Sequence, residues 1–326
     1  MKHGFSMRRA AACIGMLVLI LDSRTALVSA QAAMELIVRT VIPSLFPFFF
    51  LSVLLASSGE IGSVFLFRPI CTLFRIPQEC AYLLIPAFLG GYPAGAQSIG
   101  TAWEHGQLSK ETAERLLGHC CNAGPSFLFG ILAAYFTEWW MCWSIWGLHI
   151  LGAIAAAWMI PSGPFLMDSR TTTSHTKSVP EVLAASLGIT ANVCGWLLLF
   201  RVLIGFLDRW LFWRLPVSLQ VVLAGFLELT NGCCMLGMIT DIRLRLILCT
   251  VMLSLGGMCV FLQTKSVSKA LSIRWYVLGK CIQASVSGLT AAAFLYRSHF
   301  LLVLLLCFLF LAKSKKRSSF PVASGV

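Results

Sequence analysis

The sequence FLGGYPAGAQSIG, from Phe88 to Gly100, decides how the rest of the chain is interpreted. It lies within a long apolar run, where ordinary apolar residues would form an unbroken helix across a membrane. Its glycines lower the backbone order of a helix and Pro93 removes a backbone donor, so the sequence predicts a break. Irregular backbone at membrane depth persists only where it is buried in protein or lines a water-filled cavity. We therefore expect Gly90 to Gln97 to form an unwound segment that faces a solute rather than lipid.

The composition indicates a polytopic membrane protein. The chain is 58% hydrophobic and 12% charged, with a mean hydropathy of +0.84, whereas a soluble domain has roughly 25% charged residues. The formal net charge is +12, but the basic residues lie in short loops and in the tail, which is typical of the cytoplasmic side of a membrane protein. We therefore expect a lipid bilayer as the environment, no nucleic-acid partner, and both termini in the cytoplasm.

Apolar runs separated by polar loops predict an all-α fold with about eight to ten transmembrane helices. The first run follows Lys2, Arg8 and Arg9, so it is either an uncleaved helix, which we favour, or a cleaved signal peptide. The sequence LSKETAERLLGH is too short to span and predicts an amphipathic helix capped by Ser109, at the interface or in a re-entrant hairpin. The expected runs are Ala10–Leu21, Met34–Ser57, Glu79–Gly100, Cys120–Phe136, Trp139–Ile160, Glu181–Leu207, Pro216–Thr240, Leu244–Leu262, Ile273–Tyr296 and Phe300–Ala312.

A polar segment divides the chain into two halves. The sequence PSGPFLMDSRTTTSHTKSVP, from Pro161 to Pro180, is rich in serine and threonine and is bracketed by prolines, which is typical of a linker. We expect a basic segment with the first membrane helix, one membrane repeat on each side of the linker, and a last short helix with a basic tail. These parts are residues 1–33, 34–160, 161–180 (the linker), 181–297 and 298–326.

The two halves resemble each other in several places. The order of the paired stretches is kept, and the offset between partners shrinks along the chain, as deletions in loops would produce. We therefore expect an internal duplication, with parallel and inverted repeats both open. The pairs are the runs opened by Glu35 and Glu181, FLGGYPAG (Phe88) with FLELTNGC (Phe226), and NAGPSFLF (Asn122) with SLGGMCVF (Ser254).

Broken apolar segments that recur in both halves point to a solute site near the middle of the membrane. Here residues 90–97 pair with 228–233, and residues 122–126 pair with 254–257. Their polar side chains suit a polar, hydroxyl-bearing solute, although each one alone is more often a hydrogen bond between helices. The candidate substrate-binding residues are Gly91, Tyr92, Pro93, Gln97, Asn122, Ser126, Glu228, Thr230, Asn231 and Gln263.

Glu228 is the most informative of these residues, because it lies centrally in an apolar run. A charge there costs at least about 2.5 kcal/mol on insertion scales, so it faces the protein interior or water and is a functional candidate. Its expected partner is Lys280 or Arg201, and the alternative is an ion pair that only fixes packing. Glu35 and Arg39 are four residues apart on one helical face, where a structural pair at the interface is expected.

Enzyme motifs are absent from the sequence. It contains no HExxH, GxSxG or GxGD motif and no cysteine–histidine spacing that suits a metal. Gly279-Lys280-Cys281 lacks the remaining residues of an ATP-binding loop. We therefore expect no enzyme activity, no cofactor and no metal, and any transport would be passive or coupled to an ion.

Several stretches together resemble one known family. They match YlbJ-type sporulation integral membrane proteins, which are grouped with nucleoside-recognition (Gate) domain proteins such as spore maturation proteins A and B. The resemblance covers about residues 10–311, and the chain departs from it at Cys120-Cys121 and Gly124, where more polar residues are expected. The stretches are PSLFPFFF (Pro43–Phe50), GGYPAGAQ, GQLSKETAERLL (Gly106–Leu117), CNAGPSFLFG (Cys121–Gly130) and FLELTNGC.

The resemblance implies the cytoplasmic membrane of a spore-forming bacterium, a role in spore formation, and similarity to the gating regions of nucleoside transporters. It implies no particular substrate, because fold alone does not carry function. One hypothesis is that the protein passes or binds a small polar solute, such as a nucleoside, at a midplane site between the repeats. The alternative is a non-transporting structural component of cortex or engulfment assembly. Expected protein partners are a second copy of the chain or other sporulation membrane proteins.

Overall fold

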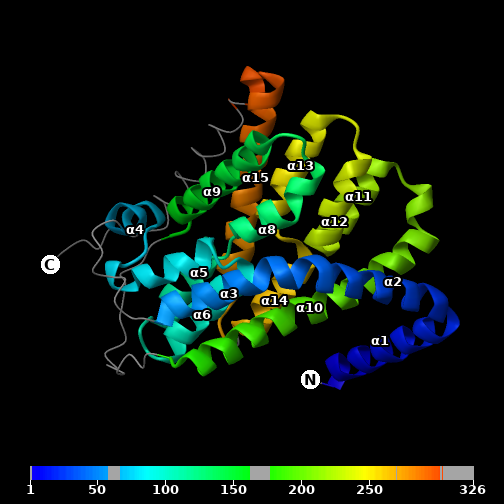
Figure 1. Ribbon diagram of the computed structural model, residues 1–326, viewed down its shortest axis with the longest axis horizontal. Coiled ribbons are helices and arrows are strands. Elements are labelled where there is room, and N and C mark those ends of the chain that lie inside the picture. The colour runs from blue at the N-terminus through cyan, green and yellow to red at the C-terminus, as the bar shows by residue number, and fades with distance from the viewer. Residues whose placement is uncertain (1, 58–66, 162–176, 269, 302, 304–326) are drawn as a thin grey trace.

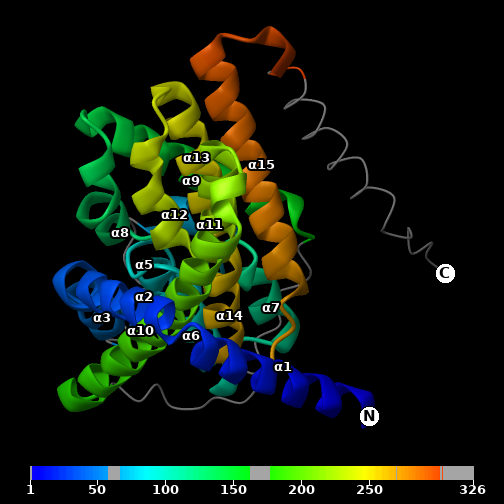
Figure 2. The ribbon, with the colours of Figure 1, turned by 90° about the vertical axis from the view of Figure 1, so that its right-hand side faces the viewer.

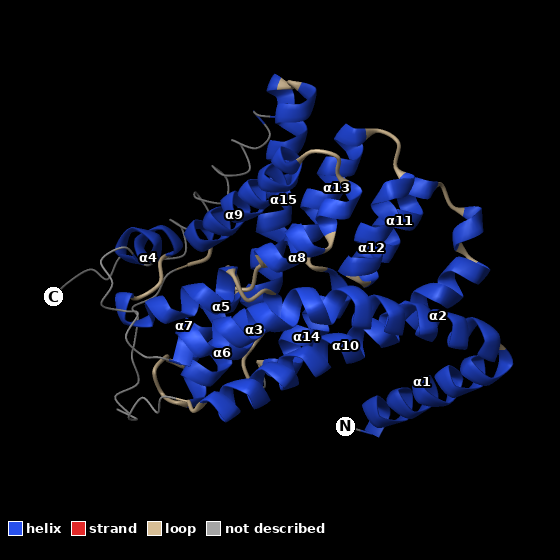
Figure 3. Cartoon of the chain, in the orientation of Figure 1, coloured by secondary structure: helices blue, strands red, loops and turns tan. Residues whose placement is uncertain are grey.

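The computed structural model describes residues 2–57, 67–161, 177–268, 270–301 and 303, and these form helices and loops without a strand among them (Figure 3). The prediction of an all-helical membrane protein is confirmed. Within the described ranges, five helical segments are long and apolar enough to span a membrane. They are Ser23–Leu55, Trp139–Met159, Val179–Trp210, Ile242–Val267 and Arg274–Tyr296.

Two long rods of helix pack against each other (Figure 1). One consists of α2 (Ser23–Leu36), a π-helical stretch (Ile37–Val41) and α3 (Ile42–Ser57), and it follows α1 (Lys2–Leu21). The other is α10 (Val179–Trp210), whose capping box joins Ser178 to Glu181. The first rod begins before the predicted Met34, because Asp22 accepts a hydrogen bond from the amide of Thr25 at 3.3 Å and caps α2.

The decisive stretch forms a hairpin of two short helices. A 3₁₀ turn (Gln78–Leu83) leads into α5 (Leu84–Phe88). The chain then turns at residues 89–91, and α6 (Tyr92–Glu104) packs back against α5. Gly91 has a φ of 88°, a backbone conformation that glycine adopts without strain. The predicted break is therefore confirmed, but it is confined to the tip. The remainder of the predicted unwound segment, from Tyr92 to Gln97, is helical because Pro93 stands in the first turn, where a missing N–H costs nothing.

A broken helix follows the hairpin. The amphipathic helix α7 (Lys110–Leu117) begins at the predicted cap, where Ser109 Oγ accepts from the amide of Thr112 at 3.2 Å. The residues from 119 to 124 are not helical, and α8 (Pro125–Gly130) and a 3₁₀ turn (Leu132–Tyr135) continue beyond them. The long helix α9 (Trp139–Met159) then closes this half.

The second half repeats this order of elements. After α10 comes a hairpin of α11 (Val217–Leu227) and α12 (Leu229–Met235), which turns at Glu228. Next is a helix broken into α13 (Ile242–Leu255) and α14 (Gly257–Val267), and last is the long helix α15 (Arg274–Tyr296). Figure 2 shows α15 extending along α13, and both α9 and α13 pack against it.

The breaks also explain why five long segments are found where more crossings were expected. The predicted runs Glu79–Gly100, Cys120–Phe136 and Pro216–Thr240 each divide into short helices. The helix α4 (Arg68–Phe74) belongs to the loop before the first hairpin. Most of the predicted run Phe300–Ala312, the basic tail, and residues 162–176 of the linker lie outside the described residues.

Candidate functional site

Each hairpin tip rests on the break in the helix that follows it. A side chain at Gly124 would stand 2.6 Å from the carbonyl oxygen of Leu89, at the first tip. A side chain at Gly257 would stand 2.7 Å from the carbonyl oxygen of Gly225 and 2.8 Å from that of Phe226, at the second tip. Glycine is required at both places because only backbone fits between the two segments.

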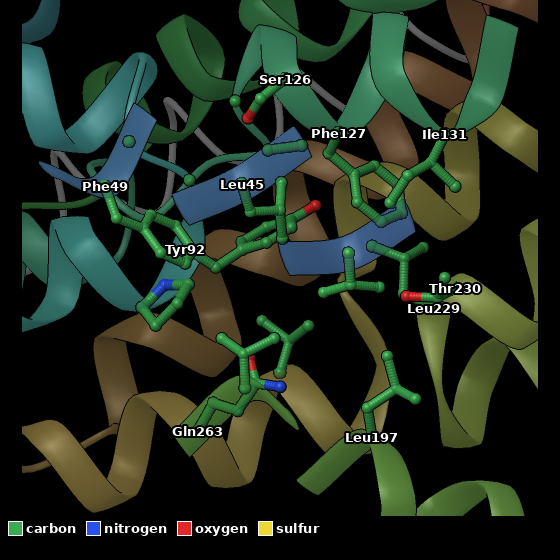
Figure 4. Close-up of a pocket in the computed structure, with 18 of the residues that line it drawn as sticks. Leu45, Phe49, Tyr92, Ser126, Phe127, Ile131, Leu197, Leu229, Thr230 and Gln263 are labelled. Atoms are coloured by element: carbon green, nitrogen blue, oxygen red, sulfur yellow. The ribbon is translucent and has the colours of Figure 1, made fainter. Parts of the chain in front are cut away.

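A cavity of about 50 Å³ lies where the two hairpin tips face the two rods. Figure 4 shows its mostly apolar wall, to which Leu45, Phe49 and Leu197 contribute, with the polar side chains of Ser126, Thr230 and Gln263 among them. The cavity is lined by Val41, Leu45, Phe49, Gly90, Gly91, Tyr92, Pro93, Ala123, Gly124, Ser126, Phe127, Ile131, Val193, Leu197, Glu228, Leu229, Thr230, Val260 and Gln263.

The structure brings together most of the predicted site residues. Those that line the cavity come from both halves of the chain, as expected for a site between repeats. Gln97 lies half-buried on α6 and outside the lining, while Asn122 and Asn231 are buried behind it. The predicted residues in the lining are Gly91, Tyr92, Pro93, Ser126, Glu228, Thr230 and Gln263.

The carboxylate of Glu228 caps the short helix that follows it. Oε1 accepts from the amide of Thr230 at 2.9 Å, and Oε2 accepts from the amide and from the side-chain nitrogen of Asn231, both at 2.7 Å. Glu228 is 3% exposed. The helix N-terminus offers unpaired amides and partial positive charge, so a buried carboxylate is stabilised there without a cation.

The predicted cation partners of Glu228 lie elsewhere. Arg201 donates to the side-chain oxygen of Asn231, so it reaches Glu228 only through that residue. Lys280 donates to the carbonyl oxygen of Cys121 at the other break. The predicted direct pairing of Glu228 with either cation is therefore wrong, because the turn at the tip already supplies its donors. Glu35 and Arg39 form the expected pair at 3.2 Å, with side chains 63% and 77% exposed.

Ser126 is a polar group that faces the cavity without a partner. Its side chain is 5% exposed, and its hydroxyl makes no hydrogen bond with the described residues. Most buried polar groups are hydrogen-bonded, so an unpaired hydroxyl beside a cavity is available to bind a solute or a water there. Opposite it, the amide nitrogen of Gln263 contacts Cys259 Sγ at 3.2 Å.

A second polar cluster lies behind the first hairpin, and sequence reasoning missed much of it. His149 Nε2 accepts from the amide of Ala123 at 3.1 Å, and its Nδ1 lies 3.2 Å from Ser254 Oγ. Ser254 donates to Ser287 at 3.1 Å. Because Nε2 accepts, the hydrogen of the neutral ring belongs on Nδ1, which makes His149 a donor to Ser254.

Gln283 joins this cluster to a predicted residue. Its side-chain nitrogen donates to Asn122 Oδ1 at 2.9 Å and to the backbone oxygen of His149 at 3.0 Å. The side-chain nitrogen of Asn122 donates in turn to the carbonyl oxygen of His119 at 2.7 Å. The cluster thus ties the break after α7 to α9 and α15. The signal that could have found it is a histidine and a glutamine, each inside an apolar run.

Tyr92 connects the cluster to the cavity. It lines the cavity, its hydroxyl donates to the carbonyl oxygen of Leu253, and its ring meets His149 edge-on with centroids 6.4 Å apart. The first hairpin is therefore held near its tip by a hydrogen bond to the second half and a ring contact with α9. The site as a whole offers hydroxyl, amide and carboxylate groups within an apolar enclosure.

Comparison with known proteins gives one similarity. The chain is 35% identical over 102 residues to the sporulation integral membrane protein YlbJ of Bacillus subtilis. The matched stretch covers 31% of this chain and 25% of that protein. No known family matches the chain in a search of family profiles. No solved structure matches it either.

Proposed function

We propose that the protein is a sporulation membrane protein that passes a small polar solute of nucleoside-like chemistry between its two hairpins. The observation that carries the proposal is the meeting of both hairpin tips, the break after α7 and the helix α14 at one cavity, with polar groups from each half. Irregular backbone inside a membrane is the feature from which transporter sites are built. The similarity to a sporulation integral membrane protein supports the cellular setting.

The repeated order of elements supports the predicted duplication. A long helix, a hairpin, a broken helix and a long helix occur in each half. The stretches paired by sequence are those that form corresponding tips and breaks, namely Phe88 with Phe226 and Asn122 with Ser254. We propose that the halves are repeats and that transport moves one part of this arrangement against another.

The size of the cavity implies that this arrangement is closed. Its volume of about 50 Å³ suits one or two waters, whereas small-molecule sites occupy roughly 300–1,000 Å³. Binding therefore requires the hairpins to separate from the rods α3 and α10. In an apolar 18-residue stretch of each spanning segment that contains a rod, 33% of the residues are buried, compared with 61% in the corresponding stretch of the segment that contains α13 and α14, so the rods are the more peripheral elements.

A wider cavity with several charged and polar residues in its wall lies on the side of α2. It has a volume of about 760 Å³ and lies between α2, α10 and the second hairpin. Arg201 lines this cavity and also contacts Asn231, which binds Glu228. We propose that the cavity is the approach for the solute and that Arg201 stands at its inner end.

Uptake into proteoliposomes tests this function. Purified full-length protein is reconstituted, and tritiated uridine and adenosine are offered to wild type, Glu228→Gln and the exposed control Glu79→Gln. We expect uptake above that of empty liposomes for wild type and Glu79→Gln. For Glu228→Gln at equal protein content we expect a loss of about tenfold or more, because the tip loses its capping carboxylate. Equal uptake by Glu228→Gln and wild type contradicts the proposal.

The second candidate function is a structural component of spore assembly. The closed cavity and the internally satisfied carboxylate of Glu228 favour it. In a deletion strain, this function predicts that wild type and a Glu228→Gln, Gln97→Ala double variant restore spore formation equally. Rescue by wild type alone, with equal membrane levels of both proteins, favours solute passage.

A further inference from the structure

A buried lysine stands at the break between α7 and α8. Lys280 belongs to α15 and is 2% exposed. A charge inside a membrane protein is expensive unless it is paired, so the surroundings of Lys280 need to compensate it. In the part of the chain that the structure describes, no carboxylate does so. The ion pairs found there include Glu35–Arg39, Glu111–Arg115 and Asp22–Arg209, and none of these involves Lys280.

Among the described residues, the hydrogen bonds and ring contacts of the amine are with groups that accept or attract a cation. Lys280 Nζ donates to the carbonyl oxygen of Cys121 and to Gln283 Oε1, the latter at 2.7 Å. The ring centroids of Tyr92 and Tyr276 lie 5.2 and 5.9 Å from it, within the range of cation–π attraction. A neutral amine carries a lone pair that calls for a donor, whereas an ammonium has three donors and no acceptor. The arrangement fits the ammonium.

Two glycines allow Lys280 to reach this place. A side chain at Gly279 would collide with the backbone of Gly118, directly after the last residue of α7. Because neither residue has a side chain, α15 touches the C-terminal end of the half-helix, where carbonyl groups carry partial negative charge. Cys121 follows in the non-helical stretch. The ammonium therefore lies against the carbonyl oxygen of Cys121, in the unwound stretch that follows this helix end, and against the side-chain oxygen of Gln283.

Oxygen cages of this construction hold ions in secondary transporters. There, unwound carbonyls and the C-terminal ends of half-helices coordinate sodium ions or protons. We propose that the break between α7 and α8 is a monovalent-cation site that the chain fills with its own ammonium, Lys280. Because this cation is covalently attached to α15, it holds the break against α15 independently of which cations are in solution. This proposal goes beyond solute passage and is tested without it.

Chemical rescue tests the tethered cation. Full-length wild type, Lys280→Ala, Lys280→Met and the exposed control Lys110→Ala are purified in detergent. Thermal unfolding is followed by tryptophan fluorescence in choline, sodium or ammonium chloride at equal ionic strength and neutral pH. We expect Lys280→Ala in choline chloride to melt about 4–10 °C below wild type. We expect ammonium or sodium ions to restore at least half of this loss, while wild type and Lys110→Ala melt alike in all three salts.

Lys280→Met distinguishes the effect of losing the positive charge from the effect of losing side-chain volume. Methionine restores most of the apolar volume but leaves the oxygens of Cys121 and Gln283 without a donor and leaves no room for an ion. We expect it to melt below wild type and to be unaffected by the choice of cation. Melting of Lys280→Met at or above the wild-type temperature overturns the proposal. So does an equal deficit of Lys280→Ala in all three salts. If Lys280→Ala yields no folded protein, the methionine variant alone decides.

Discussion

The two hairpins meet their helix breaks in the same way but obtain their charges from different places. At the second hairpin, the carboxylate of Glu228 is held by two amides within the next three residues. At the first break, the ammonium of Lys280 arrives from α15, more than a hundred residues away in sequence. The carboxylate faces the N-terminal amides of α12, and the ammonium faces a carbonyl oxygen of the unwound stretch after α7. The charge at the second hairpin is therefore held by residues next to it in the sequence, whereas the charge at the first break depends on tertiary packing.

The glycines at the two breaks differ in a corresponding way. Gly257 has a φ of 77° and sits against the carbonyl oxygens of the second tip. Gly124 has an ordinary φ of −78° and is required only by the space beside Leu89. The second break therefore constrains its glycine both by conformation and by packing, and the first by packing alone.

The largest loss of stability is expected when these glycines are replaced by alanine, and it should differ between the two. Gly257→Ala should lower the free energy of unfolding by about 3 kcal/mol or more, because a left-handed backbone and a collision add. Gly124→Ala should cost about 1–3 kcal/mol through the collision alone. Unfolding by SDS in mixed micelles measures both. Gly188→Ala, on α10 with no atom near the new methyl group, is the matched control and should stay within about 1 kcal/mol of wild type. A larger loss for Gly124→Ala than for Gly257→Ala contradicts the comparison.

Removal of the capping charge should come next in size. In Glu228→Gln, one oxygen becomes an NH₂ group that faces an amide donor, so the tip should lose about 1–3 kcal/mol. The same mixed-micelle assay measures the loss against Glu79→Gln, an exposed carboxylate. Because the site is local, hydrogen exchange should rise at residues 228–233 and stay unchanged at residues 118–124. An equal rise at both breaks means that the sites are not independent.

The cluster behind the first hairpin should respond over a longer range. His149→Leu removes the acceptor of the Ala123 amide and the hydrogen bond to Ser254, which keeps its bond to Ser287, at a cost of about 1–2 kcal/mol. Since this site depends on tertiary packing, hydrogen exchange should increase both at the break after α7 and along α9. Exchange that increases only next to residue 149 argues against this dependence.

The smallest expected effect belongs to the exposed pair. Arg39→Gln breaks an ion pair between side chains that are mostly exposed, so its cost should be below about 0.5 kcal/mol. A loss as large as that of Glu228→Gln would mean that buried and exposed charges do not differ in the expected way. The mixed-micelle assay again supplies the measurement.

The sequence predicted the local features of the molecule well. Glycines and Pro93 located the break at the first tip, and Ser109 marked the start of α7, because these features depend on neighbouring residues. The pairing of FLGGYPAG with FLELTNGC pointed to the break at the second tip. The same local chemistry explains why the break is narrower than expected. Pro93 was interpreted as a helix breaker, but at the first turn it starts a helix.

Features that depend on distant packing were predicted less well. The pairing of Glu228 with Lys280 was predicted from their opposite charges alone. The charges do not show which backbone groups of the short helices each residue faces. His149 and Gln283 were visible as polar residues in apolar runs, yet their role emerges only when α9 and α15 meet the break after α7. Asn122, which was predicted as a solute ligand, makes hydrogen bonds within this cluster.

The central claim, that the hairpins enclose a site which opens to solute, is tested most directly by labelling the variant Ser126→Cys. A membrane-impermeant, water-soluble maleimide is applied to open membrane fragments, and peptide mass spectrometry follows the reaction of the introduced thiol. The native Cys249, fully buried and outside the cavity lining, serves as the internal control. We predict that the introduced thiol reacts about tenfold or more faster than Cys249, because opening exposes the cavity to water. Equal, slow reaction of both thiols would contradict an opening site.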